Sequence, residues 1–220
     1  MNRRVFAEAL GALLLTACVV GSGIMGERLA GGNAALALLA NTAATVAVLA
    51  ALIATLGPVS GAHLNPVVSV VALGRRQLDA KSSLQYVVAQ IVGCCAGAIL
   101  ANVMFDLPAI QASTHARSGM GQWLSESVAT AGLVLVAFRS PTFEQAAWRV
   151  SLWIGAAYWF TASTSFANPA VTIARALSNT FAGISPRHVV SFIVAQLLGA
   201  GLALLVSRWL WRTPATHEIQ

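Results

Sequence analysis

Charged residues divide this chain into long stretches that contain no charge at all. A helix needs about 20 mostly apolar residues to cross the hydrocarbon core of a membrane, and several of these stretches reach that length. The longest, residues 29–74, is too long for one crossing and must hold a full span and a remainder. Charged residues make up only 9% of the chain, against about 25% in soluble domains. A water-soluble globular protein is therefore excluded.

The stretches accommodate six membrane-spanning helices, and they predict an all-α membrane protein. Two apolar segments, residues 62–73 and 165–177, are left over, and each contains an Asn-Pro pair. The predicted spans are approximately Val5–Met25, Ala34–Leu56, Leu84–Met104, Trp123–Phe138, Trp148–Ser163 and Val189–Trp209.

The net charge of +6 indicates topology rather than a nucleic-acid partner. The basic residues alternate with the spans instead of clustering on one element. Placing both termini in the cytoplasm gives most of these residues an inside position, the bias that is typical of cytoplasmic loops. The inside set is Arg3, Arg4, Arg75, Arg76, Lys81, Arg139, Arg149, Arg208 and Arg212. The outside set is Arg28, Arg117, Arg175 and Arg187.

Each Asn-Pro pair predicts a break in the chain followed by a short helix. The residue before a proline avoids the α region, so "GAHLNP" and "SFANP" should approach as extended chain. Asn65 and Asn168 then cap helices whose first residue is proline, a position where the missing N–H is no loss. Each segment is expected to form a re-entrant half-helix of about two to three turns that returns to its own side.

Three features occur in the same order in both halves of the chain. They are a glutamate in an apolar helix, an Asn-Pro-x-Val-Ser/Thr box and a Val-Ala-Gln-x-x-Gly motif. These features are found at Glu8, Asn65 and Gln90, and again at Glu126, Asn168 and Gln196. Because each unit has three spans, the second copy must enter the membrane inverted. We therefore expect one domain, residues 1–220, with repeats at about 5–104 and 121–210.

Irregular chain at mid-membrane must be covered by protein or line a watery cavity. Glu8 and Glu126 are costly inside spans, and we expect them to accept hydrogen bonds from the loop N–H groups. A charge at a helix end is the alternative, stronger for Glu8. Gln90 and Gln196 are expected to brace the same loops, or else to form simple interhelical hydrogen bonds. The small residues expected to let helices approach closely are Gly93, Gly97, Gly199 and Gly201.

The paired Asn-Pro boxes, the "SGAHLNP" sequence and the two glutamate-bearing repeats resemble the aquaporin/major intrinsic protein family over nearly the whole chain. The resemblance implies six transmembrane helices, two re-entrant half-helices in an inverted repeat, and a homotetramer with one pore per subunit. It also implies a location in a bacterial inner (plasma) membrane. It implies no cofactor, no metal and no catalytic residue, and a role for His63 in orienting the first loop. The pore boxes would be Asn65-Pro66-Val67 and Asn168-Pro169-Ala170, with Val67 replacing the family's alanine.

The two asparagines carry the expected function. Asn65 and Asn168 should aim amide donors into the lumen, where two positive helix ends converge. Converging dipoles repel cations and hydronium. The sequence therefore predicts a passive path for uncharged, hydroxyl-bearing solutes.

The outer constriction separates this chain from most of the family it resembles. The family usually has an arginine directly after the second box, and this chain has Val171. Matching without gaps from the two boxes puts the remaining filter positions at Thr45, Ala156 and Ser165. Such small side chains widen the constriction and remove its fixed charge, which favours glycerol, urea and neutral metalloid hydroxides (arsenite, antimonite). In this respect the chain resembles the bacterial arsenic-associated S type of the aquaglyceroporin branch.

Arg175 lies four residues after Val171, on the same helix face and about one turn nearer the outside. Two interpretations stay open for it. The arginine either moves positive charge into the outer vestibule, or binds loop carbonyls at the C-terminus of its half-helix.

Other functions have weaker support. An ion-coupled secondary transporter also uses broken helices and inverted repeats, but no carboxylate adjoins Asn65 or Asn168 in the sequence. An intramembrane enzyme needs a catalytic set at one depth, and the four histidines have no evident nucleophile or metal partner. A channel mainly for water differs only in its constriction. The three cysteines, at 18, 94 and 95, favour helix packing over thiol capture of arsenic.

Overall fold

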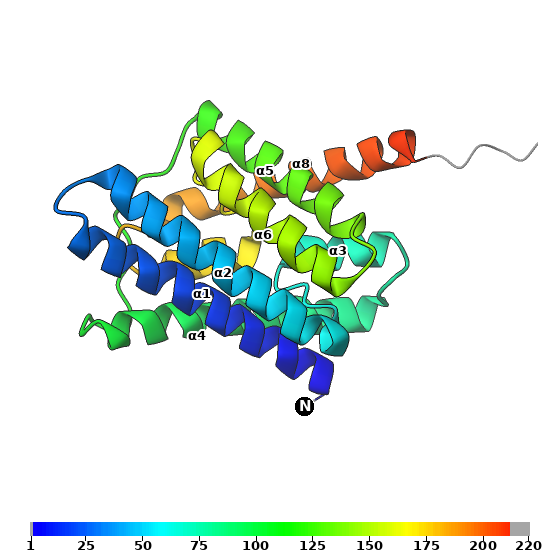
Figure 1. The fold of residues 1–220 in the computed structure, drawn as a ribbon, viewed down its shortest axis with the longest axis horizontal. Coiled ribbons are helices and arrows are strands. Elements are labelled where there is room, and N and C mark those ends of the chain that lie inside the picture. Colours follow the sequence, from blue (N-terminus) through cyan, green and yellow to red (C-terminus); the bar gives the residue numbers. More distant parts are fainter. Residues whose placement is uncertain (1, 212–220) are drawn as a thin grey trace, which may run out of the picture.

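The computed structural model describes residues 2–211, and in that part of the chain all regular structure is helical (Figure 1). Six helices are long and two are short, which confirms the all-α class and the two half-helices. The long helices are α1 (Arg3–Leu29), α2 (Ala34–Ser60), α4 (Ala80–Met104), α5 (Met120–Phe138), α6 (Phe143–Phe160) and α8 (Pro186–Leu210). The short ones are α3 (Pro66–Gly74) and α7 (Pro169–Arg175). The predicted cytoplasmic C-terminus, with Arg212 and the last histidine, lies outside the described residues.

Length and composition alone qualify α1, α2, α4 and α8 to cross a membrane. Helices α5 and α6 are shorter, with 19 and 18 residues. The predicted fifth span is displaced: α6 begins at Phe143 and ends at Phe160, whereas the sequence suggested Trp148–Ser163. Thr142 starts α6 early because its side chain accepts a hydrogen bond from the Gln145 N–H. The chain leaves the helix early because it must extend into the second re-entrant loop.

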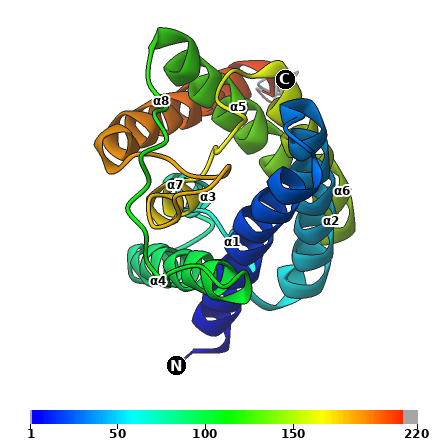
Figure 2. The same cartoon turned by 90° about the vertical axis from the view of Figure 1, so that its left-hand side faces the viewer.

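The long helices surround the two half-helices (Figure 2). Helix α1 packs against α4, and α5 packs against α8 in the same way. Glycine makes both contacts possible: a Cβ on Gly93 would lie 2.2 Å from the Ala9 carbonyl oxygen, and one on Gly199 would lie 2.2 Å from the Ser127 carbonyl oxygen. Gly201 was expected to act in the same way, but a Cβ on Gly201 would have no neighbouring atom within 4 Å, so this glycine is not needed for a close helix contact.

Both half-helices begin as the Asn-Pro pairs predict. The Asn65 side chain accepts a hydrogen bond from the Val67 N–H, and that of Asn168 accepts from the two N–H groups that follow its proline. The preceding loops contain non-glycine residues with left-handed backbone conformations. They are Ala62, Leu64, Thr164, Ser165 and Ala167, with φ between 45° and 60°. Such conformations cost about 1–2 kcal/mol each, so the surrounding contacts must hold them.

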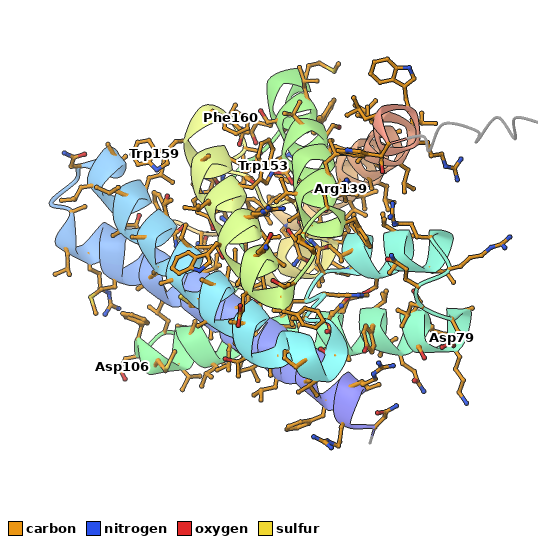
Figure 3. The ribbon with its side chains drawn as sticks, turned by 45° about the vertical axis from the view of Figure 1, so that its right-hand side comes forward. Asp79, Asp106, Arg139, Trp153, Trp159 and Phe160 are labelled. Atoms are coloured by element: carbon orange, nitrogen blue, oxygen red, sulfur yellow. The ribbon has the colours of Figure 1, made fainter. Side chains whose placement is uncertain are left out.

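The outer surface of the bundle is largely apolar, and charged residues gather at its ends. Asp79 and Asp106 lie at opposite ends of α4, and the exposed side chains of Trp159 and Phe160 lie at the end of α6 (Figure 3). Trp153 instead packs between α6 and α5, where its indole N–H donates to the Ala129 carbonyl at 2.9 Å. An apolar surface around a polar interior is the arrangement that a lipid environment requires.

Candidate pore

A cavity of about 460 Å³ lies inside the bundle, between the long helices and the two re-entrant loops. Its wall combines apolar side chains of α1, α2, α5 and α6 with two stretches of loop backbone, residues 61–65 and 165–168. Phe138 and Phe143, next to the α5–α6 connection, line one end, and Arg175 lines the other. The cavity therefore passes both Asn-Pro boxes on one continuous path.

The two asparagines lie side by side at the centre of this path. The Asn65 side-chain N–H donates to the Ala167 carbonyl at 2.8 Å, and the Asn168 side-chain N–H donates to the Leu64 carbonyl at 2.8 Å. Each amide carries two N–H donors, so one closes the contact between the halves and one is left for the lumen. The contact between the two loops, which the sequence did not predict, uses one donor of each amide.

Glu8 lies behind the first loop and gathers four donors. One carboxylate oxygen accepts from the Ser60 hydroxyl at 2.6 Å and the His63 N–H at 3.0 Å. The other accepts from the Leu64 N–H at 2.7 Å and the Gln90 amide at 2.8 Å. This side chain is fully buried, so a helix-end charge at the membrane surface does not describe it.

Glu126 repeats the arrangement behind the second loop. Its carboxylate accepts from the Phe166 N–H at 2.9 Å, the Ala167 N–H at 2.8 Å and the Gln196 amide at 2.7 Å. Hydrogen bonds to a buried charge are worth about 1.5–3 kcal/mol each. The two glutamates thus hold the strained loops that form the cavity wall.

The two glutamines connect each glutamate to the half-helix in front of it. Gln90 donates its second N–H to the Ser69 hydroxyl at 3.0 Å, and Gln196 donates to the Thr172 hydroxyl at 2.9 Å. His63 also lies within 3.1 Å of the Ser69 hydroxyl and packs edge-on against the Tyr86 ring. His63 is thereby fixed where it lines the cavity.

The unusual valine in the first box points away from the cavity. Val67 is 1% exposed and packs with Val134 and Ala200, on α5 and α8. Ala170, its counterpart in the second box, is also buried outside the cavity wall. Pro66 and Pro169 are buried at the starts of their half-helices. The change from alanine to valine therefore alters helix packing and leaves the lumen unchanged.

Three of the four predicted filter residues line the cavity, and one does not. Thr45, Ser165 and Val171 are on the wall. Ala156 is exposed on the outer surface of the bundle, so its assignment to the filter is wrong. On α6 the inward stripe runs through Ile154 and then, one turn later, Tyr158.

Tyr158 is thus the α6 residue nearest the expected filter position. It lies two places along the helix from Ala156, which is a rotation of about 200°. Its hydroxyl is 3.2 Å from that of Thr45. The periodicity of the apolar residues in α6 could have revealed this, whereas counting back from the Asn-Pro box could not.

The hydroxyl groups of Thr45 and Ser165 differ in whether they have a hydrogen-bond partner. Thr45 donates to the Asn41 carbonyl at 2.8 Å. The Ser165 hydroxyl is buried and has no hydrogen-bond partner within residues 2–211. Ser165 lines the cavity as a residue, but its hydroxyl oxygen is itself buried.

Arg175 occupies the outer end of the cavity and is 3% exposed. Its Nε donates to the Ala182 carbonyl, and its guanidinium carbon lies 3.4 Å from the centroid of the Phe166 ring. The side chain is therefore on the cavity wall and on a loop carbonyl at the same time. The carbonyl contact agrees with the second interpretation left open by the sequence. The first, a positive charge moved into the outer vestibule, stays a prediction.

Arg117 is a residue that the sequence did not single out. It belongs to the connection between α4 and α5, yet it is 7% exposed, and its guanidinium donates to the Gly183 carbonyl at 2.8 Å. Its guanidinium carbon also lies 5.0 Å from the centroid of the Phe166 ring. Burial lowers the pKa of Arg117 to about 10, which still leaves it charged at neutral pH. A long-range fold-back of this kind has no local sequence signal.

The three cysteines lie away from the cavity. Cys18, Cys94 and Cys95 are free thiols, and none of them is on the cavity wall. Among the described residues, no three side chains of His, Cys, Asp or Glu are placed to hold a metal ion. The polar groups of the cavity wall are amides, hydroxyls, backbone groups, the His63 imidazole and one guanidinium.

Comparison with known proteins agrees with this architecture. The profile of the major intrinsic protein family matches residues 1–145 and 137–218. The chain is 52% identical to aquaglyceroporin AqpS of Rhizobium meliloti (strain 1021), over 96% of this chain and 91% of that protein. It is 33% identical to aquaporin A of Dictyostelium discoideum, over 93% of this chain and 77% of that protein. 

A solved structure extends the comparison to the fold. The X-ray structure of the aquaglyceroporin from Plasmodium falciparum matches 93% of this chain and 94% of its own, with a TM-score of 0.73 at 19% identity. The paired half-helices and the inverted repeat therefore have a precedent. With a family profile over nearly its whole length and a relative more than half identical to it, this chain belongs to the major intrinsic protein family of membrane channels.

Proposed function

We propose that this protein is a passive channel for small uncharged solutes, with a wide outer constriction that carries no arginine of its own. The solutes are neutral metalloid hydroxides such as arsenite and antimonite, polyols such as glycerol, and water. The name of the 52% identical relative, aquaglyceroporin, supports a solute range wider than water. The geometry of the constriction supports it independently.

The observation that carries the proposal is Val171 on the cavity wall. Together with Thr45 and Ser165 it forms a wall of short side chains, and Tyr158 adds a hydroxyl beside Thr45. A solute with several hydroxyl groups can bond to the polar side of this wall while its carbon or metalloid centre passes the valine. A guanidinium at position 171 would occupy that space and add a charge.

The asparagines explain why the path suits uncharged solutes. Each solute oxygen can accept one N–H from Asn65 and one from Asn168, since each amide has a second donor after closing the central contact. The N-termini of α3 and α7 meet at the same point, and their partial positive charge disfavours cations. Glu8 and Glu126 direct their oxygens at the loop backbone and do not line the cavity.

We further propose that both termini are cytoplasmic, in a bacterial inner membrane, and that four copies assemble with one pore each. The distribution of arginine and lysine over the connections supports the orientation. The identity to a protein of Rhizobium meliloti supports the bacterial setting. The exposed apolar surfaces of the long helices fit both lipid and neighbouring subunits.

Substitution of Val171 by arginine tests the proposed constriction. We expect Val171→Arg to reduce glycerol and arsenite flux in proteoliposomes more than water flux, because the new side chain narrows and charges the proposed constriction. Val171→Ala, which keeps the wall neutral, should retain glycerol flux at equal protein amounts. Equal losses of glycerol and water in the arginine variant would contradict the proposed filter.

The two alternatives make different predictions for the same vesicles. A channel mainly for water would show little glycerol or arsenite flux even in the wild type. An ion-coupled transporter would show saturable flux that follows an ion gradient. The described cavity wall favours neither coupling nor catalysis, since Arg175 is its charged residue and no carboxylate lines it.

A further inference from the structure

Two arginines from distant parts of the chain bind three consecutive carbonyl groups of the loop after α7. Arg117 donates to the carbonyls of Phe181, at 3.2 Å, and Gly183, at 2.8 Å. Arg175 donates to the carbonyl between them, that of Ala182. The planar fork of Arg117 therefore spans the peptide unit that anchors Arg175, a geometry that a single ammonium group cannot reproduce.

The Phe166 ring connects the same two arginines to the second re-entrant loop. The guanidinium carbon of Arg175 lies 3.4 Å from the ring centroid, and that of Arg117 lies 5.0 Å from it. Phe166 is itself fixed, because its backbone N–H donates to Glu126 at 2.9 Å. A third bond of Arg117, to the Ser163 carbonyl at 3.4 Å, reaches the beginning of the loop. Arg117 thus contacts both the loop after α7 and the second re-entrant loop.

The connection that carries Arg117, residues 105–119, is tied down along its length. Its backbone pairs with the loop after α7 through Gln111 to Leu177 and Ser113 to Ala176, both at 3.0 Å. The loop closes the pairing through Ser185, which donates to the connection at 2.8 Å. The connection between the two halves therefore lies across the pore mouth as a strap.

Two further contacts fix Arg117 within this strap. Its backbone N–H donates to the ring nitrogen of His188 at 3.1 Å. A side chain on Gly183 would lie 2.3 Å from the Ser113 hydroxyl, so only glycine permits this approach. The position of the arginine is therefore set by the strap.

Stability alone does not account for a buried arginine in this position. Within residues 2–211 the Arg117 guanidinium has no carboxylate hydrogen-bond partner, and its side-chain hydrogen bonds all go to carbonyl groups. Desolvating a guanidinium without an ion-pair partner is expensive. The bonds of the Arg117 guanidinium to the carbonyls on either side fix the position of the Ala182 carbonyl. That carbonyl in turn fixes the position of Arg175 on the cavity wall.

We propose that Arg117 is a specificity-determining positioning residue of the outer pore mouth, acting through Arg175. The proposal rests on the proposed channel function. With Arg117 in place, Arg175 is held by the Ala182 carbonyl and the Phe166 ring, beside the proposed passage at Val171. Without it, the Arg175 side chain is released and reaches into the lumen, where it obstructs large solutes more than water.

The test compares Arg117→Met and Arg117→Lys with the wild type in proteoliposomes, measuring glycerol and water permeability at equal protein amounts. We expect the glycerol-to-water permeability ratio to fall by at least about twofold in both variants, the lower end of coupling between residues that share partners. Lysine keeps the charge and loses the fork, so a wild-type ratio in Arg117→Lys would overturn positioning in favour of charge. Arg187→Met, an exposed arginine at the start of α8, is the matched control and should keep the wild-type ratio.

A second background separates positioning from a general structural role. The double variants that combine Arg175→Ala with Arg117→Met or Arg117→Lys should have the same glycerol-to-water permeability ratio as Arg175→Ala alone. The reason is that no Arg175 side chain is present to be released into the lumen. A fall of the same size in both backgrounds, or equal losses of glycerol and water in the single variants, would overturn the proposal. Should Arg117→Met fail to fold, Arg117→Lys carries the same comparison. Wild-type vesicles without glycerol flux would instead refute the proposed function.

Discussion

The two re-entrant regions of this protein share one skeleton and differ in what surrounds it. In both, a glutamate holds the loop backbone, a glutamine joins the glutamate to a half-helix hydroxyl, and an asparagine crosses to the other loop at 2.8 Å. Glu8 gathers four donors and Glu126 three. The common skeleton fixes where the two asparagines meet, and it does so twice with the same residue types.

The surroundings separate the regions. In the first region one aromatic pair adjoins the loop, with the His63 ring edge-on to the Tyr86 ring. The second surrounds its loop with Phe166 and two arginines, Arg117 and Arg175. The repeat therefore supplies the mid-membrane geometry, and the residues that break the repeat distinguish one mouth of the pore from the other.

The largest expected effect tests the shared skeleton. We expect Glu8→Gln and Glu126→Gln each to lower the free energy of unfolding by about 3 kcal/mol or more, because the new amide group points a donor at donors in a buried site. Thermal unfolding of the purified protein in detergent measures this loss, with Glu144→Gln at an exposed helix start as the control. A wild-type unfolding temperature in either variant would show that the skeleton does not depend on the carboxylate.

The helix contacts behind the two regions should respond almost as strongly. Gly93→Ala and Gly199→Ala place a methyl group 2.2 Å from a carbonyl oxygen of the neighbouring helix, and overpacking typically costs about 1–3 kcal/mol. Gly201→Ala, on the same helix as Gly199, meets open space and should be neutral or slightly stabilising. The same unfolding assay distinguishes them. If Gly93→Ala were tolerated and Gly199→Ala were not, the two halves would differ in packing as well as in their mouths.

The smallest expected effect concerns one buried tyrosine in each region. Tyr86 donates to the Ser60 carbonyl at 2.8 Å, so Tyr86→Phe should cost about 1 kcal/mol of stability and leave solute selectivity unchanged. Tyr158 lies on the cavity wall. Tyr158→Phe should lower glycerol permeability by up to about fivefold, the equivalent of one hydrogen bond. Thermal unfolding and glycerol flux in vesicles are measured for both variants. Equal glycerol flux in Tyr86→Phe and Tyr158→Phe would contradict a role of the Tyr158 hydroxyl in solute passage.

Spacing and residue type were sufficient to predict the repeated elements. The long uncharged stretches, the Asn-Pro caps and the motifs around Glu8 and Glu126 are local or strictly repeated signals, and they predicted the helices, the half-helices and the inverted repeat. Predictions that depended on rotation about a helix axis were less secure. Ala156 was placed in the filter by counting residues, and α6 turns it to the outer surface.

By itself, the sequence of this protein determined its class, its symmetry and the neutral residue after the second Asn-Pro box. Charge spacing relative to membrane thickness and the chemistry of Asn-Pro act over a few residues, so they are readable without coordinates. Only the tertiary structure decided that Tyr158 faces the cavity, that each asparagine uses one donor on the opposite loop, and that Arg117 binds carbonyl groups of the loop after α7. Those facts depend on how helices rotate and how a connection folds back, and no local preference of the chain encodes either.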